Sequence, residues 1–246
     1  METVIIYIFI IIVLLIIVKV FLILPTARKK FKEGDKSILN GFRVGNGRLQ
    51  GDRDYQTNYF ATIQNNDDLL VVISDGITDN KKGELASVLA VEILKGNFKN
   101  NLYRVLGLEA FFKRSTEQIR KRLEENILSP NLGLISALII GKTMYYMSTG
   151  NNKLFLYRSG ELIDLTCNKE VSKKLNNLQI KRKDLLLFAS TGASEGLTEM
   201  EILCHLPQTC HPQDKCQRLL QKMHEKRLKY QKNSVIIILE QMDKSH

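Results

Sequence analysis

The longest apolar run of the chain lies at its N-terminus. Every residue from Val4 to Leu24 is apolar or aromatic except Lys19. At 1.5 Å per residue, a helix of about 21 residues spans roughly 30 Å, the thickness of a bilayer hydrocarbon core. A cleaved signal peptide would have a basic start and a small-residue cleavage site, and a buried core helix would have a polar face. We therefore expect residues 1–24 to form a retained transmembrane anchor.

Basic residues follow this run directly and none precedes it. The cluster consists of Arg28, Lys29, Lys30 and Lys32. Because positive charge is retained on the cytoplasmic side, the sequence predicts a single-pass protein of the cell membrane with its C-terminal part in the cytoplasm. The same cluster can contact anionic lipid headgroups, so the membrane is an expected partner. In that compartment the cysteines would be free thiols.

Composition narrows the classes that the rest of the chain can belong to. The chain has 246 residues, of which 44% are hydrophobic and 25% are charged, with four cysteines. These values exclude a disordered tail, a collagen-like repeat and a disulfide miniprotein. The net charge of +10 favours an anionic partner. The basic residues are spread along the chain without interleaved aromatics, which argues against nucleic acid.

The remaining sequence is typical of a juxtamembrane linker followed by one domain. Residues 25–40 are polar and charged and predict the linker, and residues 41–246 predict the domain. Short apolar runs bounded by turn residues predict strands, and helical spacing of apolar residues predicts helices. Their alternation predicts an α+β layered domain. The expected strands are 69–74, 134–140, 143–148, 154–158, a short one near 162, 185–189 and 235–239, and the expected helices are 83–96, 108–127 and 216–228.

Five segments, in order along residues 45–240, carry a family resemblance. They are Gly51–Phe60 (GDRDYQTNYF), Ser74–Asp79 (SDGITD) with the following Gly83–Ser87 (GELAS), Gly150–Arg158 (GNNKLFLYR), Ser190–Gly192 (STG) and Lys232–Val235 (KNSV). This series resembles the motifs G-x-R-x-x-Q-x-D-x-F, D-G-x-G-G with G-E-x-A-S, G-D-S-R, S-D-G and D-N-x-T of the metal-dependent protein phosphatases, the protein phosphatase 2C-like or PPM family. The resemblance implies two packed antiparallel β-sheets flanked by helix pairs.

The family's chemistry makes the departures from its motifs informative. In the family, two Mn²⁺ or Mg²⁺ ions activate a water that attacks phosphoserine or phosphothreonine, and such hard cations need several carboxylates. Only Asp75 stands at a position that matches a metal-binding aspartate, with Gly76 and Asp79 as further residual metal contacts. The positions where the family has the other aspartates hold Asn58, Asn151, Thr191 and Lys232.

Four lost carboxylates, one of them exchanged for a cation, should weaken metal binding severely. The resemblance therefore predicts a pseudophosphatase with no resident metal, and Mn²⁺ or Mg²⁺ only if activity remains. Asn58, Asn151 and Thr191 can keep loop hydrogen bonds while losing the charge. Asp52, Asp54 or Asp79 could compensate for the missing ligands, and Asp79 is the best candidate because it shares a loop with Asp75.

Two retained residues have alternative interpretations. Arg53 matches the arginine that holds the substrate phosphate in the family, and its planar guanidinium suits that role. It could equally be a surface arginine paired with Asp52 or Asp54. Asp75 could bind a single metal ion, or it could cap its own turn.

A cysteine and histidine cluster, Cys204, His205, Cys210, His211 and Cys216, offers soft ligands at short spacing. Zinc binding and ordinary packing are both open interpretations. The basic stretch of residues 217–232 is either the solvated face of an amphipathic helix or a docking surface.

These observations predict a membrane-anchored, cytoplasmic phosphatase-like domain that acts as a binding or scaffolding module. Its expected partner is a protein, for example a phosphoprotein or a kinase. The alternatives are a divergent Mn²⁺/Mg²⁺-dependent serine/threonine phosphatase that uses Asp75 with Asp79 or Asp54, and a structural subunit of a membrane complex. The oligomeric state stays open.

Overall fold

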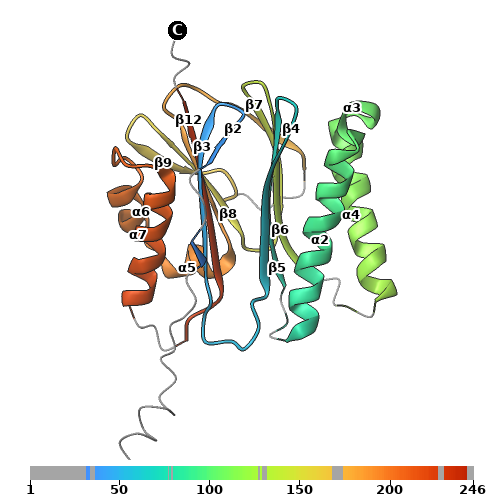
Figure 1. Cartoon of the computed structure of the whole chain (residues 1–246), viewed down its shortest axis with the longest axis horizontal. Coiled ribbons are helices and arrows are strands. Elements are labelled where there is room, and N and C mark those ends of the chain that lie inside the picture. The colour runs from blue at the N-terminus through green and yellow to red at the C-terminus, as the bar shows by residue number, and fades with distance from the viewer. Residues whose placement is uncertain are drawn as a thin grey trace, which may run out of the picture. The chain divides into compact units, whose positions relative to one another are not determined.

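The structure is a computed structural model that describes residues 32–33, 37–76, 78, 80–126, 128, 132–167, 174–226 and 230–242. In these residues two antiparallel β-sheets pack face to face, and helices cover the outer face of each sheet (Figure 1). The predicted α+β arrangement of two packed antiparallel sheets flanked by helices is confirmed.

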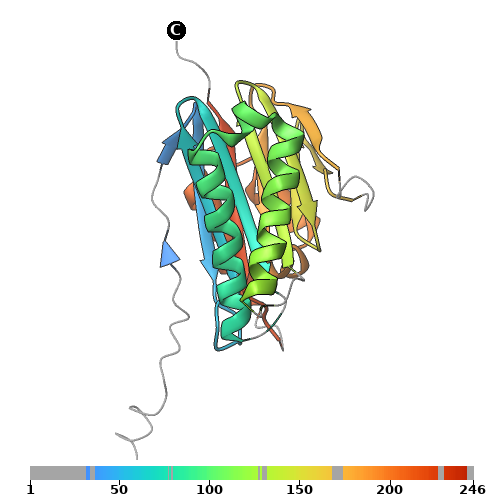
Figure 2. The same ribbon diagram turned by 90° about the vertical axis from the view of Figure 1, so that its right-hand side faces the viewer.

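One sheet is built from the middle of the chain and has the strand order β10-β7-β6-β5-β4. The helices α2 and α4 lie side by side across its outer face, with the short α3 between them in sequence (Figure 2). The strands are β4 (Asn58–Asn65), β5 (Asp68–Gly76), β6 (Leu132–Ile140), β7 (Thr143–Thr149) and β10 (Asn176–Gln179), and the helices are α2 (Lys81–Lys99), α3 (Leu102–Leu106) and α4 (Leu108–Glu125).

The second sheet joins the two ends of the described chain in the order β1-β3-β12-β11-β8-β9, with β2 also paired to β3. Helices α6 and α7 cover its outer face (Figure 1). The strands are β1 (Lys32–Glu33), β2 (Ser37–Leu39), β3 (Phe42–Leu49), β8 (Lys153–Arg158), β9 (Glu161–Asp164), β11 (Leu185–Ala189) and β12 (Ser234–Gln241), and the helices are α5 (Thr191–Gly196), α6 (Glu199–His205) and α7 (Pro212–Glu225).

The continuous apolar run of β5 is explained by burial on both faces of its strand. Leu69, Val71 and Ile73 point into the core between the sheets, where they share a cluster with residues of β11 and β12. Leu70 and Val72 point the other way and pack beneath α2 and α4. Successive side chains of a strand alternate between faces, so a strand covered on both sides has no polar alternation. This packing holds the end of β5 in a fixed position.

The folded unit begins before residue 41. Residues Lys32–Glu33 and Ser37–Leu39 pair antiparallel with β3, and Leu39 packs against the inter-sheet core. Part of the segment predicted as a linker over residues 25–40 therefore contributes strands, because β3 would otherwise leave an unpaired edge.

The predicted membrane anchor, residues 1–24, lies outside the described residues, as do Arg28, Lys29 and Lys30. No helix within the described residues has the length and apolar character needed to cross a membrane. The anchor and the cytoplasmic orientation remain predictions.

Candidate functional site

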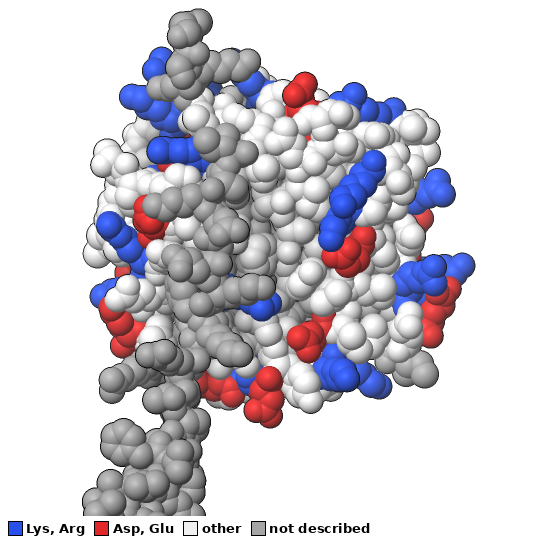
Figure 3. All heavy atoms as spheres, viewed as in Figure 1, with Lys and Arg blue, Asp and Glu red and all other residues white. Residues whose placement is uncertain are grey.

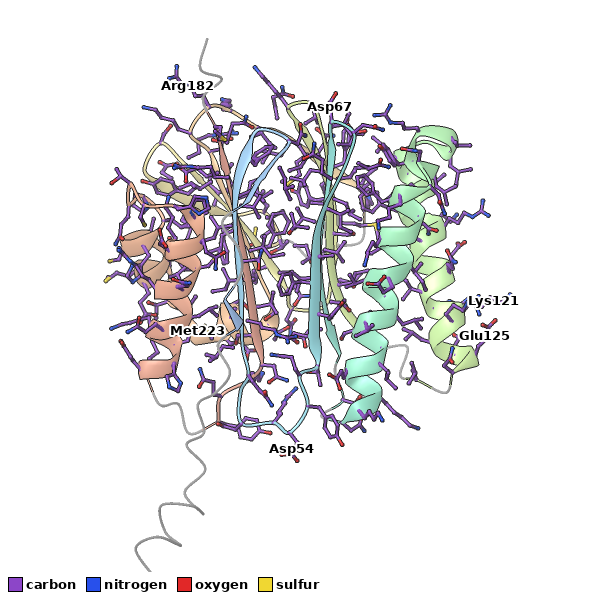
Figure 4. All side chains as sticks on the ribbon, in the orientation of Figure 1. Asp54, Asp67, Lys121, Glu125, Arg182 and Met223 are labelled. Atoms are coloured by element: carbon purple, nitrogen blue, oxygen red, sulfur yellow. The ribbon has the colours of Figure 1, made fainter. Side chains whose placement is uncertain are left out.

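A pocket of about 320 Å³ lies at the end of the sandwich where β5 finishes. Asp54, which follows Arg53 in the β3–β4 loop, marks this end in Figure 4, whereas Asp67 and Arg182 lie at the opposite end. Six residues predicted from the sequence line the pocket together with three further glycines, which come from β6, the β7–β8 turn and α5. The lining consists of Arg53, Asp75, Gly76, Gly133, Gly150, Asn151, Thr191, Gly192 and Lys232.

Asp75 and Gly76 enter the pocket as the last two residues of β5. The Gly76 N–H donates to Thr57 O at 2.9 Å, which ties this end of the strand to the start of β4. A Cβ on Gly76 would lie 2.2 Å from Gly83 O in the first turn of α2, so only glycine fits between strand and helix. The close approach of α2 fixes the place of Asp75.

Arg53 reaches the pocket from a loop that is fastened to the segment before β12. Gly51 N donates to Asn233 Oδ1 at 2.9 Å, and Asn233 Nδ2 donates to Tyr55 O at 2.6 Å. The Gln231 N–H also donates to the Asp52 carboxylate at 2.7 Å. These bonds hold the loop of Arg53 against the segment of Lys232, so both cations are presented to one cavity.

Asn151 and Thr191 come from two turns on the far side of the pocket. Gly150 adopts a left-handed φ of 77° in the tight β7–β8 turn that carries Asn151. Thr191 begins α5, and its N–H donates to Asn152 Oδ1 at 3.0 Å. Neighbouring Asn152 therefore joins the two turns through one amide oxygen.

Asn58 lies beneath the pocket and is fully buried. It stands opposite Asp75 in the β4–β5 register. Its Nδ2 donates to Ser190 Oγ at 3.0 Å and to Asn233 O at 2.9 Å. The carbonyl can only accept, so an amide nitrogen is needed at this position and a carboxylate would not serve. The sequence prediction that Asn58 keeps loop hydrogen bonds is consistent with these contacts.

The charges around the pocket act on one another. Burial raises the pKa of Asp75 above its ordinary value, although hydrogen bonding to Thr191 and the positive charges of Arg53 and Lys232 oppose that rise. Lys232 Nζ also pairs with Glu195 Oε2 at 2.6 Å, with both side chains about half exposed. Two cations and one carboxylate therefore line the cavity, and a second carboxylate pairs with the lysine.

The lining does not fit the two divalent cations that the resemblance implies. Among the described residues, Asp75 is the only carboxylate of the lining, accompanied by an amide, a hydroxyl and two cations. No group of three or more histidine, cysteine, aspartate or glutamate side chains within the described residues is arranged to hold a metal ion. Hard cations need several oxygen anions, and two nearby positive charges repel them.

Other predicted site residues fall elsewhere. Asp79 lies outside the described residues, and Lys32 contributes its backbone to β1. Cys204 and His205 lie on α6, Cys216 is buried in α7, and the His211 ring accepts from the Gln213 N–H at the start of α7. Within the described residues, these cysteines and histidines form no group that is arranged to hold a zinc ion.

Sequence reasoning missed Glu195, because a carboxylate four residues after Thr191 becomes a neighbour of Lys232 only when α5 forms.

Basic and acidic side chains are interspersed over the face shown in Figure 3, in keeping with a positive charge spread along the chain.

Comparisons with known proteins identify the fold. No family model and no curated protein sequence matches the chain. The solved structures that resemble it include the S. agalactiae serine/threonine phosphatase. This phosphatase has 15% identity and a TM-score of 0.71, and the match covers 82% of this chain and 100% of that one. The Mycobacterium tuberculosis phosphatase PstP/Ppp has 18% identity and a TM-score of 0.68, covering 82% and 99%. Pseudomonas aeruginosa PppA has 16% identity and a TM-score of 0.64, covering 80% and 96%.

The structural neighbours are serine/threonine phosphatases of the protein phosphatase 2C type, and the predicted resemblance is confirmed at the level of the fold. The PstP catalytic domain has also been solved with two manganese ions. At these identities the likeness establishes the fold alone, so the chemistry of this chain has to be argued from its own pocket.

Proposed function

We propose that this chain is a binding or scaffolding module that holds a phosphorylated protein at its pocket without hydrolysing the phosphate. The observation that carries the proposal is the charge of the lining, where Arg53 and Lys232 face a cavity with Asp75 as the single described carboxylate. A phosphate group is a doubly charged anion with three acceptor oxygens, so it suits two converging cations.

The geometry of Arg53 supports this role. The hydrogen bonds between side chains and backbone groups of residues 51–55 and 231–233 hold its loop in place, which lowers the entropy lost when an anion binds. A planar guanidinium donates two parallel hydrogen bonds to phosphate oxygens. Tyr55 and Tyr230, in the same two loops, are large exposed side chains that offer contact area for the peptide around a phosphorylated residue.

A protein partner is also in keeping with one of the structural neighbours. Pseudomonas aeruginosa PppA is described as a key regulatory component of a T6SS. We extend this to a regulatory binding role here, with the phosphoprotein or a kinase as partner. Residues 4–24 and the basic cluster after them would hold the module at the cytoplasmic face of a membrane.

Arg53→Ala is expected to weaken binding of a phosphothreonine peptide about 10- to 100-fold, the usual effect of losing hydrogen bonds between charged groups. Binding would be measured by fluorescence anisotropy with the full-length chain in a mild detergent. The matched control is Arg182→Ala at the opposite end of the sandwich, which should bind like the unmodified chain.

Equal binding by the Arg53→Ala variant, or equal binding of the unphosphorylated peptide, would contradict the proposal. The peptide recovered after each titration should still be phosphorylated when examined by mass spectrometry. Release of phosphate in the presence of Mn²⁺ or Mg²⁺ would instead support the divergent phosphatase, the alternative function for this fold.

A further inference from the structure

Lys232 brings a positive charge to a position where a metal site would need a negatively charged ligand. It lies two residues before β12 and lines the cavity together with Asp75 and Thr191. The resemblance puts a metal-binding aspartate at this position, so the lining loses a ligand and gains a permanent cation. The structure shows how that cation is held.

The backbone around Lys232 is fixed by close contacts with the start of α5. A Cβ on Gly192 would lie 2.2 Å from Asn233 O and 2.9 Å from Lys232 Cβ, so the two segments touch where only a glycine fits. Ser234 Oγ donates to Lys232 O at 3.1 Å, and Asn233 is bonded to the Arg53 loop. The side chain of Lys232 therefore leaves a rigid segment at the edge of the pocket.

The ammonium end is also positioned. Lys232 Nζ lies 2.6 Å from Glu195 Oε2, and the two side chains are 41% and 50% exposed. An exposed ion pair of this kind contributes little to stability, so the lysine can readily exchange the glutamate for another anion. The lysine charge nevertheless acts across the cavity on the Asp75 carboxylate, from the same pocket as Arg53.

We propose that the Lys232 ammonium takes the place of the divalent cation in this pocket, so that a phosphate monoester binds between Lys232 and Arg53 without any metal. Glu195 pairs with the ammonium at the pocket edge and competes for it with the incoming phosphate. This inference rests on the proposed function, because it names the group that neutralises the phosphate there. It predicts that binding is insensitive to chelators.

The test measures binding of a phosphothreonine peptide to the full-length chain in EDTA and in Mn²⁺. The unmodified chain should bind equally well in both buffers. Lys232→Met, which keeps the aliphatic stem and removes the charge, should lose about 10-fold or more in both, and Lys232→Arg should restore most of the loss. Lys121→Met, on α4 and far from the pocket, is the matched control.

The Glu195→Gln variant separates a binding role of Lys232 from a structural one. If Lys232 only stabilised the fold, loss of its ion pair with Glu195 would not tighten peptide binding. Removing the competing carboxylate should tighten peptide binding by about 2- to 5-fold, the worth of an exposed ion pair. Binding that requires Mn²⁺, or Lys232→Met binding as tightly as the unmodified chain, would overturn the inference. If Arg53→Ala still weakens binding in that case, the proposed function stands; if the unmodified chain binds no phosphopeptide in either buffer, both fall.

Discussion

Aspartate introduced together at Asn151, Thr191 and Lys232 should create a manganese site in this pocket. The three positions line one cavity with Asp75, so the lining would hold four carboxylates. Its formal charge would change from +1 to −3, because three carboxylates are added and one ammonium is lost. We expect Mn²⁺ affinity to rise at least about 100-fold, since single ligand-shell changes alone alter it 10- to 100-fold.

Calorimetric titration of Mn²⁺ into the triple variant measures this gain directly. The same three substitutions in an Asp75→Ala background serve as the control, and they should bind the ion much more weakly. If the triple variant binds Mn²⁺ no better than the unmodified chain, missing carboxylates are not what separates this pocket from a metal site. Turnover of p-nitrophenyl phosphate by the triple variant with Mn²⁺ would further show that the fold still supports the family's chemistry.

Asn58→Asp should destabilise the protein even though it restores a family residue. The Asn58 side chain is buried, and its Nδ2 donates to the Asn233 carbonyl and to Ser190 Oγ. An ionised carboxylate would be buried facing that carbonyl, to which it cannot donate, and it could keep the contact with Ser190 only if the hydroxyl turned to donate. We expect the free energy of unfolding to fall by about 2–4 kcal/mol, the range for an unsatisfied buried polar or charged group.

Urea unfolding followed by circular dichroism checks this prediction. Asn66→Asp is the matched control, because Asn66 is exposed in the β4–β5 turn at a φ of 52°, a conformation that aspartate also tolerates. That variant should stay within about 0.5 kcal/mol of the unmodified chain. The deficit of Asn58→Asp should shrink in acid, where the carboxyl is protonated; a stability equal to that of the unmodified chain at neutral pH would contradict the contacts assigned to Asn58.

The elements predicted correctly are those whose apolar pattern is local. The runs at Leu185–Ala189 and Val235–Leu239 form β11 and the centre of β12, and the stripe of Phe112, Ile119 and Leu123 forms the buried face of α4. In each case the burial of successive residues follows from the period of the sequence itself. Boundaries differ by a few residues, because helix caps such as Asn80 extend the elements beyond their apolar pattern.

The strand β3 was not predicted, and the reason is tertiary. Its sequence, FRVGNGRL, contains two glycines that weaken a strand pattern. A Cβ on Gly45 would lie 2.2 Å from the Pro212 backbone, so this glycine is required by the close approach of α7. The contact joins residues 167 positions apart in the chain, which is beyond any local pattern.

The sequence motifs predicted which residues line the candidate site, but they did not predict the contacts that those residues make. Six of the named residues line one pocket because each lies at the end of an element, or in the loop beside one, at the same edge of the sandwich. The pairing of Lys232 with Glu195 and the donor role of Asn58 depend on distances that only the folded chain supplies. Asp79, the proposed compensating ligand, lies outside the described residues.

The proposed role requires that the pocket bind phosphate without metal-dependent hydrolysis. The most direct measurement is a calorimetric titration of the full-length chain with Mn²⁺ and Mg²⁺, with hydrolysis of p-nitrophenyl phosphate and a phosphothreonine peptide followed in the same sample. We expect no metal binding at the pocket and no turnover above that of an Asp75→Ala variant. Metal-dependent turnover that Asp75→Ala abolishes would contradict it and would identify the chain as a divergent phosphatase.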